Sequence, residues 1–435
     1  MGDATRPIAL WRDRTFRFIW GGQTASLFGD QVTNLALPWL LLHQTHSAFA
    51  AGAVSAVRYL PLLTFGLAAG LIADRVERRA LMIAADVGRL VALGAVALVG
   101  VLGRVPPLWL LVLVVLTLGT GQLLFGVAYG AWLPDVTGDA RLGQANAALE
   151  SSDAASVLAG GPLGGALITA VGPVLALGAD ALSYGVSAVT LTRVRTERPV
   201  GQAPLGDTTG NAQTSGLWAE ATAGVRAILA LPAQRLIKGA ATALHMDAGA
   251  IGVLLATLTQ LRLHLPAWQA GLVFGAAGVG GLIASAVAPR LYDRGWQRGV
   301  AVAPRLYDRG WQRGVAVALA IAALGSAGLA GASLLDRGPG FVVALVANAV
   351  LDGAVALGFV LATTASTLVT PRALRGRVNA ASTIYASLVR GGAAVGLGAL
   401  AGTGDPLPAF VVLAACCACA ALVTSRVRLE RGGES

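Results

Sequence analysis

Long apolar runs alternate with short polar segments along nearly the whole chain. Most of these runs reach or exceed the roughly 20 residues that an α-helix needs to cross a bilayer. The pattern predicts an all-α integral membrane protein with twelve transmembrane helices in two pseudo-symmetric six-helix bundles. The first six helices are expected over residues 16–42, 48–73, 80–103, 107–133, 145–171 and 173–192, and the second six over 236–261, 267–287, 315–335, 341–369, 380–402 and 407–423.

The composition agrees with this pattern. Hydrophobic residues make up 55% of the 435 residues, charged residues only 12%, and the mean hydropathy is +0.69. A soluble chain of this length could not bury so much apolar surface. The net charge of +10 could suggest a nucleic-acid partner, but the arginines lie between apolar runs, so we expect no nucleic acid and a lipid bilayer instead.

Arginines are unevenly shared between the turns. Arg75, Arg78, Arg79 and Arg141 lie in turns that follow every second run, and further arginines crowd both termini, whereas the opposite turns hold only Arg104, Arg262 and Arg337. Positive loops stay in the cytoplasm. We therefore expect a multi-pass protein of the bacterial inner membrane with both termini cytoplasmic.

One polar stretch divides the chain. Residues 196–215 are rich in Pro, Gly and Thr, as in a flexible linker, and the weakly amphipathic 217–231 is expected to lie along the membrane surface. We expect a six-helix bundle over 1–195, a cytoplasmic linker with a surface helix over 196–235, and a second bundle over 236–435. Similar turns recur in both halves, which is typical of transporters that alternate access between two bundles.

A tandem duplication interrupts the second half. Residues 286–300 and 301–315 are identical, and the extra copy lengthens the turn between the eighth and ninth predicted spans. Loops tolerate insertions, so we expect the fold to survive and assign the copy no function.

Several motifs resemble one family. The turn Gly70 to Arg79 is similar to the loop between helices 2 and 3 in the major facilitator superfamily. The opening Phe16 to Gln23, the turn Leu133-Pro134-Asp135 and the segment Asp180-Ala181-Leu182-Ser183-Tyr184 resemble its macrolide-efflux and enterobactin-exporter branch. The resemblance implies a solute transporter, and this branch implies export.

The fifth predicted helix carries a glycine–proline cluster. Its residues are similar to the antiporter motif of exporters, although the proline lies one residue nearer the last glycine pair than in the family. A plain packing seam between helices is the alternative. The cluster consists of Gly160, Gly161, Pro162, Gly164 and Gly165.

Charged residues inside the predicted spans are the main candidates for function, because charges at bilayer depth are costly. Asp30 and Arg58 fall at similar depths in neighbouring antiparallel spans, so they can pair. Asp30 is then either a proton-binding group or half of a permanent structural pair. Glu150 and Asp153 lie one helical turn apart on one helix face. They can share a proton, or they can line a water-filled cytoplasmic end of the transport pathway.

The second half has its own candidates. His245 and Asp247 lie two residues apart in the seventh predicted span, where the histidine can relay protons. Arg390 in the eleventh span can pair with Asp352 in the tenth. Asp180 is expected to brace helix contacts rather than to couple transport.

The charged turn itself predicts a conformational latch, since its residues can hold one bundle against the other. A plain topology signal is the alternative. The latch candidates are Gly70, Asp74, Arg75, Arg78, Arg79, Asp86 and Arg89.

These patterns together favour a proton-coupled secondary transporter that exports a hydrophobic or amphipathic small molecule, an antibiotic or a secondary metabolite. A siderophore exporter, a nutrient importer and a non-transporting sensor of the same fold remain open. No P-loop and no catalytic cluster occur in the sequence, so we expect neither an enzyme nor a cofactor. Cys416, Cys417 and Cys419 point in different directions on a helix, so no metal site is expected; we expect a monomer.

Overall fold

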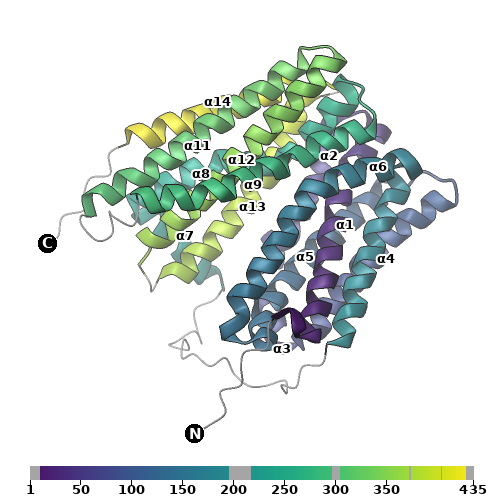
Figure 1. Ribbon diagram of the computed structural model, residues 1–435, viewed down its shortest axis with the longest axis horizontal. Helices are drawn as coiled ribbons and strands as arrows, with labels where there is room; N and C mark the ends of the chain where they lie inside the picture. The colour runs from purple at the N-terminus through teal and green to yellow at the C-terminus, as the bar shows by residue number, and fades with distance from the viewer. Residues whose placement is uncertain (1–9, 195–216, 296–303, 372–373, 403, 428–435) are drawn as a thin grey trace, which may run out of the picture. The chain divides into compact units, whose positions relative to one another are not determined.

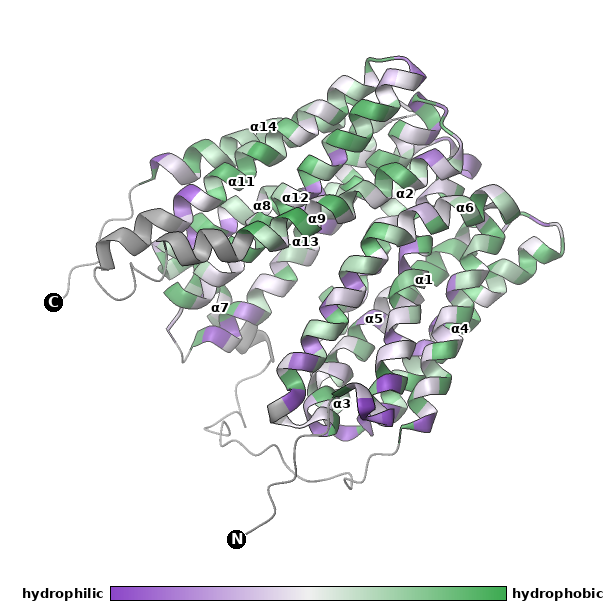
Figure 2. Cartoon of the chain, viewed as in Figure 1, coloured by the Kyte–Doolittle hydropathy of each residue, from purple (hydrophilic) through white to green (hydrophobic). Residues whose placement is uncertain are grey.

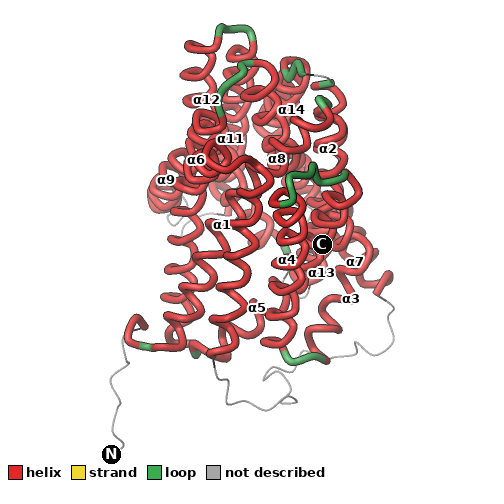
Figure 3. The backbone as a smooth tube through the Cα atoms, turned by 90° about the vertical axis from the view of Figure 1, so that its right-hand side faces the viewer, coloured by secondary structure: helices red, strands yellow, loops and turns green. Residues whose placement is uncertain are grey.

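The computed structural model describes residues 10–194, 217–295, 304–371, 374–402 and 404–427. Within these ranges the side chains of residues 67, 68, 71, 74, 139, 140, 217–221, 288–295 and 304–310 are not described. The regular structure of the described residues is helical throughout, and short loops join most of the helices (Figure 3).

The first half of the chain forms long helices that match the predicted spans (Figure 1). A short 3-10 helix, η1, precedes them at Leu10–Arg12, and η2 (Val57–Tyr59) interrupts the second span. The α-helices are α1 (Arg14–Thr45), α2 (Ala48–Ala56), α3 (Leu60–Arg75), α4 (Arg78–Val101), α5 (Leu108–Thr137) and α6 (Asp139–Arg193).

The second half repeats this arrangement after helix α7 (Leu217–Ala230). A π-helix, η3, extends α8 over Thr257–Arg262. The remaining helices are α8 (Pro232–Ala256), α9 (Ala267–Gly295), α11 (Pro304–Ser333), α12 (Arg337–Val369), α13 (Arg375–Ala401) and α14 (Leu407–Arg426).

The twelve predicted spans are confirmed, with local differences. The fifth and sixth spans form one element, α6, whose non-helical backbone lies at Gly172, with φ +83°. A left-handed φ suits glycine, and Pro173 then starts the next helical segment. Helix α11 begins at Pro304, which is eleven residues before the start predicted for the ninth span, at residue 315. The helix continues through charged residues of the duplicated segment. Residues 296–303 of that duplication lie outside the described part.

The exposed faces of the helices are apolar. On α4, Val87, Val91 and Leu98 are exposed, whereas Asp86 and Arg89 on the other face are buried. Figure 2 shows hydrophobic residues along most of the long helices and hydrophilic residues toward several of their ends. This pattern is the reverse of a soluble protein and is expected for helices that face lipid.

Ten stretches of the described residues are long and apolar enough to cross a membrane. One of them, 141–193, contains both helical segments that meet at Gly172. The 32-residue helix α1 is not among the ten, although at about 1.5 Å per residue it is long enough to span a bilayer. It carries a polar stripe that includes Gln23, Asp30 and Thr33.

The chain forms two compact units. Unit 1 contains the described residues of Met1–Leu37 and Leu60–Gly210, and unit 2 contains those of Pro38–Tyr59 and Asn211–Ser435. The second span is therefore divided: α2 and η2 belong to unit 2, where α2 packs against α13, and α3 belongs to unit 1.

Close helix packing in unit 2 depends on paired glycines. A Cβ atom on Gly280 of α9 would lie 2.0 Å from the Ala349 carbonyl oxygen and 2.7 Å from the Gly353 nitrogen of α12. These are backbone atoms, which cannot move aside as a flexible side chain can. The two helices approach so closely because neither carries a side chain at this crossing.

We predict that Gly280→Ala destabilises unit 2 by about 1–3 kcal/mol, the usual cost of overpacking. The adjacent Gly281→Ala is the matched control, since its Cβ would meet only the Asp352 carboxylate, at 3.9 Å. Thermal unfolding is measured with a thiol-reactive dye that reports exposure of the buried Cys417, in a Cys416→Ala/Cys419→Ala background. Equal unfolding temperatures for the two variants would contradict the packing argument.

Candidate functional site

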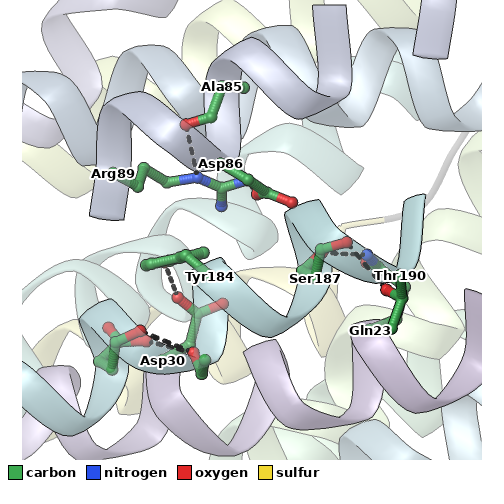
Figure 4. A network of polar contacts seen from close by, with 10 residues as sticks. Gln23, Asp30, Ala85, Asp86, Arg89, Tyr184, Ser187 and Thr190 are labelled. Carbon is green, nitrogen blue, oxygen red and sulfur yellow. Dashed lines mark hydrogen bonds and ion pairs between the residues drawn. The ribbon is translucent and has the colours of Figure 1, made fainter. Parts of the chain in front are cut away.

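A buried polar network in unit 1 joins α1, α4 and α6 (Figure 4). Its centre is the half-buried Asp30 of α1, whose carboxylate accepts a hydrogen bond from the hydroxyl of Tyr184 on α6. Tyr184 is almost completely buried, with 2% of its surface exposed. The hydrogen bond therefore holds a carboxylate of α1 against the interior of the unit.

Asp180, one helical turn before Tyr184, connects the same two helices. Its Oδ2 accepts a hydrogen bond from Thr33 of α1, and its Oδ1 accepts one of 2.9 Å from Ser183. The side chain of Asp180 is completely buried. This arrangement fits the expectation that Asp180 braces helix contacts.

A cation completes the network from α4. Arg89 forms an ion pair with Asp86, and both side chains are buried. The guanidinium carbon of Arg89 lies 4.2 Å from the centre of the Tyr184 ring and 5.2 Å from that of Phe125, as in cation–π contacts. Tyr184 thus touches Arg89 with its ring and Asp30 with its hydroxyl.

The network holds more acidic than basic groups. Asp30 interacts electrostatically with both Asp180 and Asp86, and Arg89 is the cation that faces them. Unbalanced charge in an apolar bundle is costly, and binding a proton is the simplest way to reduce it.

The predicted partner of Asp30 lies elsewhere in the chain. Arg58 is part of η2, which belongs to unit 2, whereas Asp30 belongs to unit 1. The ion pair between Asp30 and Arg58 stays a prediction. The partner of Asp30 within its own unit is Tyr184.

The other acidic candidates of unit 1 differ in their surroundings. Glu150 and Asp153 are exposed on α6, one turn apart. Ser152, between them in sequence, points the other way and accepts a 3.0 Å hydrogen bond from Thr24 of α1. The two carboxylates therefore lie on an exposed face of α6, and Asp153 interacts electrostatically with both Glu150 and Asp30.

The glycine–proline cluster of α6 packs on α1. A Cβ on Gly160 would meet the Gln31 side chain at 2.4 Å, and one on Gly164 would meet the Val32 backbone at 3.3 Å. Gly161 and Gly165 are also buried, and Pro162 is half-buried. The cluster thus brings α6 close to the part of α1 that carries Asp30.

The charged turn makes contacts within unit 1. Arg78 pairs with Asp135 at 2.8 Å, and Arg79 donates hydrogen bonds to the carbonyl oxygens of Leu191 and Thr192 at the end of α6. Arg75 is exposed and Gly70 half-buried, and the Asp74 side chain lies outside the described part. Asp86 and Arg89, also predicted for the latch, lie in the buried network, and their part in a latch stays a prediction.

Unit 2 carries the remaining candidates. His245 of α8 contacts the Phe359 ring of α12, with 4.9 Å between ring centres, and Arg390 of α13 lies over the same ring. Asp247 is buried with 2% exposure. The expected ion pair between Arg390 and Asp352 was wrong: among the described residues the ion pairs within 4.0 Å are Arg78–Asp135, Arg89–Asp86 and Arg141–Asp13. The described residues also contain no group of three or more metal-ligand side chains.

Sequence reasoning missed the central role of Tyr184. Asp180, Ser183, Tyr184 and Ser187 recur at three- and four-residue intervals, which places them on one helix face. Ser187 indeed accepts a 3.2 Å hydrogen bond from Gln23 of α1. That polar stripe inside an otherwise apolar span was the signal that could have identified the residue.

Sequence comparison finds related efflux proteins. The chain is 28% identical over 181 residues to macrolide efflux protein A of Streptococcus pyogenes, covering 41% of this chain and 44% of that protein. It is 31% identical over 183 residues to the multidrug efflux pump Tap of Mycobacterium tuberculosis, covering 39% and 41%. The aligned part thus spans less than half the length of each relative.

Structural comparison covers nearly the whole chain. A bacterial homologue of the iron transporter ferroportin, in an inward-facing state, has a TM-score of 0.67 at 17% identity and covers 95% of this chain and 97% of its own. An auto-inhibited peptide transporter of the POT family has a TM-score of 0.70 at 13% identity, with 97% and 99% covered. Identities this low show the fold alone.

The sequence profile of a large transporter family extends over most of the chain, from residue 19 to residue 397. Together with the helical fold and the bacterial efflux relatives, it places the chain among multi-pass bacterial membrane proteins. The chain belongs to the Major Facilitator Superfamily.

Proposed function

We propose that the protein is a secondary active transporter that uses the proton gradient to export a hydrophobic or amphipathic small molecule, such as an antibiotic or a secondary metabolite. The observation that carries the proposal is the buried contact between Asp30 and Tyr184, with Arg89 against the same ring. Two relatives that are named as efflux proteins support the direction of transport.

Alternating access supplies the framework for this function. We propose that the halves 1–195 and 236–435 move relative to each other about the linker 196–235, in the bacterial inner membrane and with both termini in the cytoplasm. The arginine-rich turns support this orientation. In this scheme the charged turn with Asp74, Arg75, Arg78 and Arg79 stabilises one facing state.

Proton coupling follows from the chemistry of Asp30. When its carboxylate is ionised, it accepts the Tyr184 hydrogen bond and faces the charge of Arg89 across the ring. A proton from the outside converts it to a neutral acid, which weakens both interactions and shifts the balance between the facing states. Release of that proton to the cytoplasm restores the ionised network, so one proton enters for each cycle of Asp30.

We predict that Asp30→Asn abolishes proton-coupled efflux, because an amide cannot carry the proton. Inverted vesicles are energised, and proton release is followed after addition of fluorescent lipophilic cations, macrolides and amphipathic anions. The matched control is Asp336→Asn, which removes an exposed carboxylate at the start of α12.

The outcomes separate the alternatives. Proton movement that is lost in Asp30→Asn and kept in Asp336→Asn supports proton-coupled export. Uphill uptake that depends on Asp30 would indicate an importer. Folded protein that moves no proton with any substrate would overturn the proposal and favour a sensor of the same fold.

We predict that Tyr184→Phe lowers proton-driven efflux by about tenfold or more. It removes a hydrogen bond to a charged group, an interaction worth about 1.5–3 kcal/mol, while the ring that faces Arg89 remains. Tyr129→Phe is the matched control, since the buried Tyr129 hydroxyl has no hydrogen-bond partner among the described residues. Efflux is measured in the same vesicles, at equal protein levels. An equal loss in both variants would show that the Asp30 contact has no special role.

A further inference from the structure

A second polar cluster, in unit 2, differs from the network around Asp30 in its charge. Lys238, Thr242 and His245 follow one another on α8 at intervals of four and three residues, which places them on one face of the helix. All three are half-buried, as are Phe359 of α12 and Tyr385 and Arg390 of α13. We call these six residues the basic aromatic cluster.

Ring contacts hold the cluster together. The Phe359 ring lies between His245, with 4.9 Å between ring centres, and the Arg390 guanidinium carbon, 5.9 Å from the ring centre. The Tyr385 ring lies 6.4 Å from His245, and its hydroxyl contacts Thr242 and the Lys238 carbonyl oxygen. Side chains from three helices therefore meet around one pair of aromatic rings.

The positive charge of the cluster is not balanced by the described residues. Arg390 and Lys238 both interact electrostatically with His245, and neither forms an ion pair within 4.0 Å in the described part of the chain. Asp247 and Asp352, the acidic residues of α8 and α12, interact with each other. Two cations in a partly buried, aromatic setting without a carboxylate are costly unless an anion joins them.

Two nitrogen atoms of the cluster also lack partners. The Nδ1 of His245 and the Nε of Arg390 are buried, and neither has a hydrogen-bond partner among the described residues. A buried donor without an acceptor costs about 1–3 kcal/mol. Both atoms belong to side chains that contact Phe359, so an acceptor bound beside this ring can satisfy the Arg390 donor and lie close to His245.

The position of Arg390 is fixed by the packing of α8 against α13. A Cβ on Gly249 of α8 would lie 2.2–2.7 Å from backbone atoms of Arg390, so the two helices are nearly in backbone contact there. This contact fixes the backbone from which the Arg390 side chain extends to the Phe359 ring, where its guanidinium carbon lies 5.9 Å from the ring centre.

We propose that the basic aromatic cluster binds the anionic group of an amphipathic substrate, a carboxylate or a phosphate, with the apolar part of that molecule against Phe359 and Tyr385. This inference rests on the proposed export function and narrows its substrate class from hydrophobic molecules in general to amphipathic anions. Arg390 supplies the charge-assisted hydrogen bond, and Lys238 adds long-range attraction.

The test compares two probes that differ only in charge. Dansylglycine carries a carboxylate, and dansylglycinamide carries a neutral amide on the same fluorophore. Their affinities for the full-length protein are measured at equilibrium in phosphatidylcholine nanodiscs, with no proton gradient. We expect dansylglycine to bind about tenfold tighter or more, as a charge-assisted hydrogen bond allows.

The variants assign this preference to the cluster. Arg390→Gln should reduce the ratio of the two affinities to less than about threefold, and Arg390→Lys should keep most of it. Arg262→Gln is the matched control, because Arg262 is an exposed arginine of the same unit. Equal affinities of the two probes for the unchanged protein would overturn the proposal even if Arg390→Gln failed to fold, and so would a ratio that Arg390→Gln leaves unaltered.

A lipid headgroup has the same chemistry as a phosphate substrate, so a second series replaces part of the phosphatidylcholine with phosphatidylglycerol. An unchanged dansylglycine affinity supports a dissolved substrate. Displacement of the probe that depends on Arg390 would assign the cluster to a lipid and overturn its role in substrate binding. The binding assay uses no proton gradient. A failure of proton-driven efflux would therefore not alter the measured preference for the anionic probe, and equal affinities of the two probes would not contradict proton-driven efflux.

Discussion

The structure depends on one constraint: the hydrocarbon core of a membrane offers no hydrogen bonds, so polar groups must find partners inside the helix bundle. Helix α4 shows how this is met, with Val87, Val91 and Leu98 exposed and Asp86 and Arg89 buried together. Polar side chains of α1 and α6 likewise turn toward each other, at Thr33 with Asp180 and at Gln23 with Ser187. The same constraint makes each buried charge without a partner informative about function.

The two units satisfy this constraint differently. In unit 1 Asp30 and Asp180 accept hydrogen bonds and Asp86 pairs with Arg89, although the other oxygen of Asp86 has no hydrogen-bond partner among the described residues. Tyr184 links Asp30 to the Arg89 cation. In unit 2 the cations gather around Phe359, and the buried nitrogens of His245 and Arg390 find no acceptor among the described residues. An acidic network with one cation suits a small ion that comes and goes, whereas a basic cluster without a carboxylate suits a larger partner that supplies its own acceptors. Such a division would let one unit respond to protons and the other to the transported molecule.

The fold could be predicted from the sequence because hydropathy acts over whole helices, and the twelve predicted spans agree with the helices observed. Pairing between side chains could not be predicted as well. Asp30 was matched with Arg58 by depth alone, and this pair stays a prediction. The hydrogen bond between Asp30 and Tyr184 of a much later helix was not predicted, because depth does not fix which way a side chain points. Arg390 and Asp352 illustrate the same limit, since opposite charges on neighbouring helices form no ion pair here. The break of the second span at η2 was also missed, although Pro61 follows η2 closely and proline disfavours a helical conformation of the residue before it.

The division of the second span affects how the chain is made. Residues 38–59 belong to unit 2, where α2 packs against α13. Roughly 320 residues separate Ala56 from Arg375, where α13 begins, and synthesis proceeds at about 5–20 residues per second. The α2 segment therefore waits some tens of seconds in the membrane before its helical neighbour exists. During that interval lipid, the insertion machinery or a chaperone must cover its packing face, so biogenesis of this protein cannot proceed strictly one half after the other.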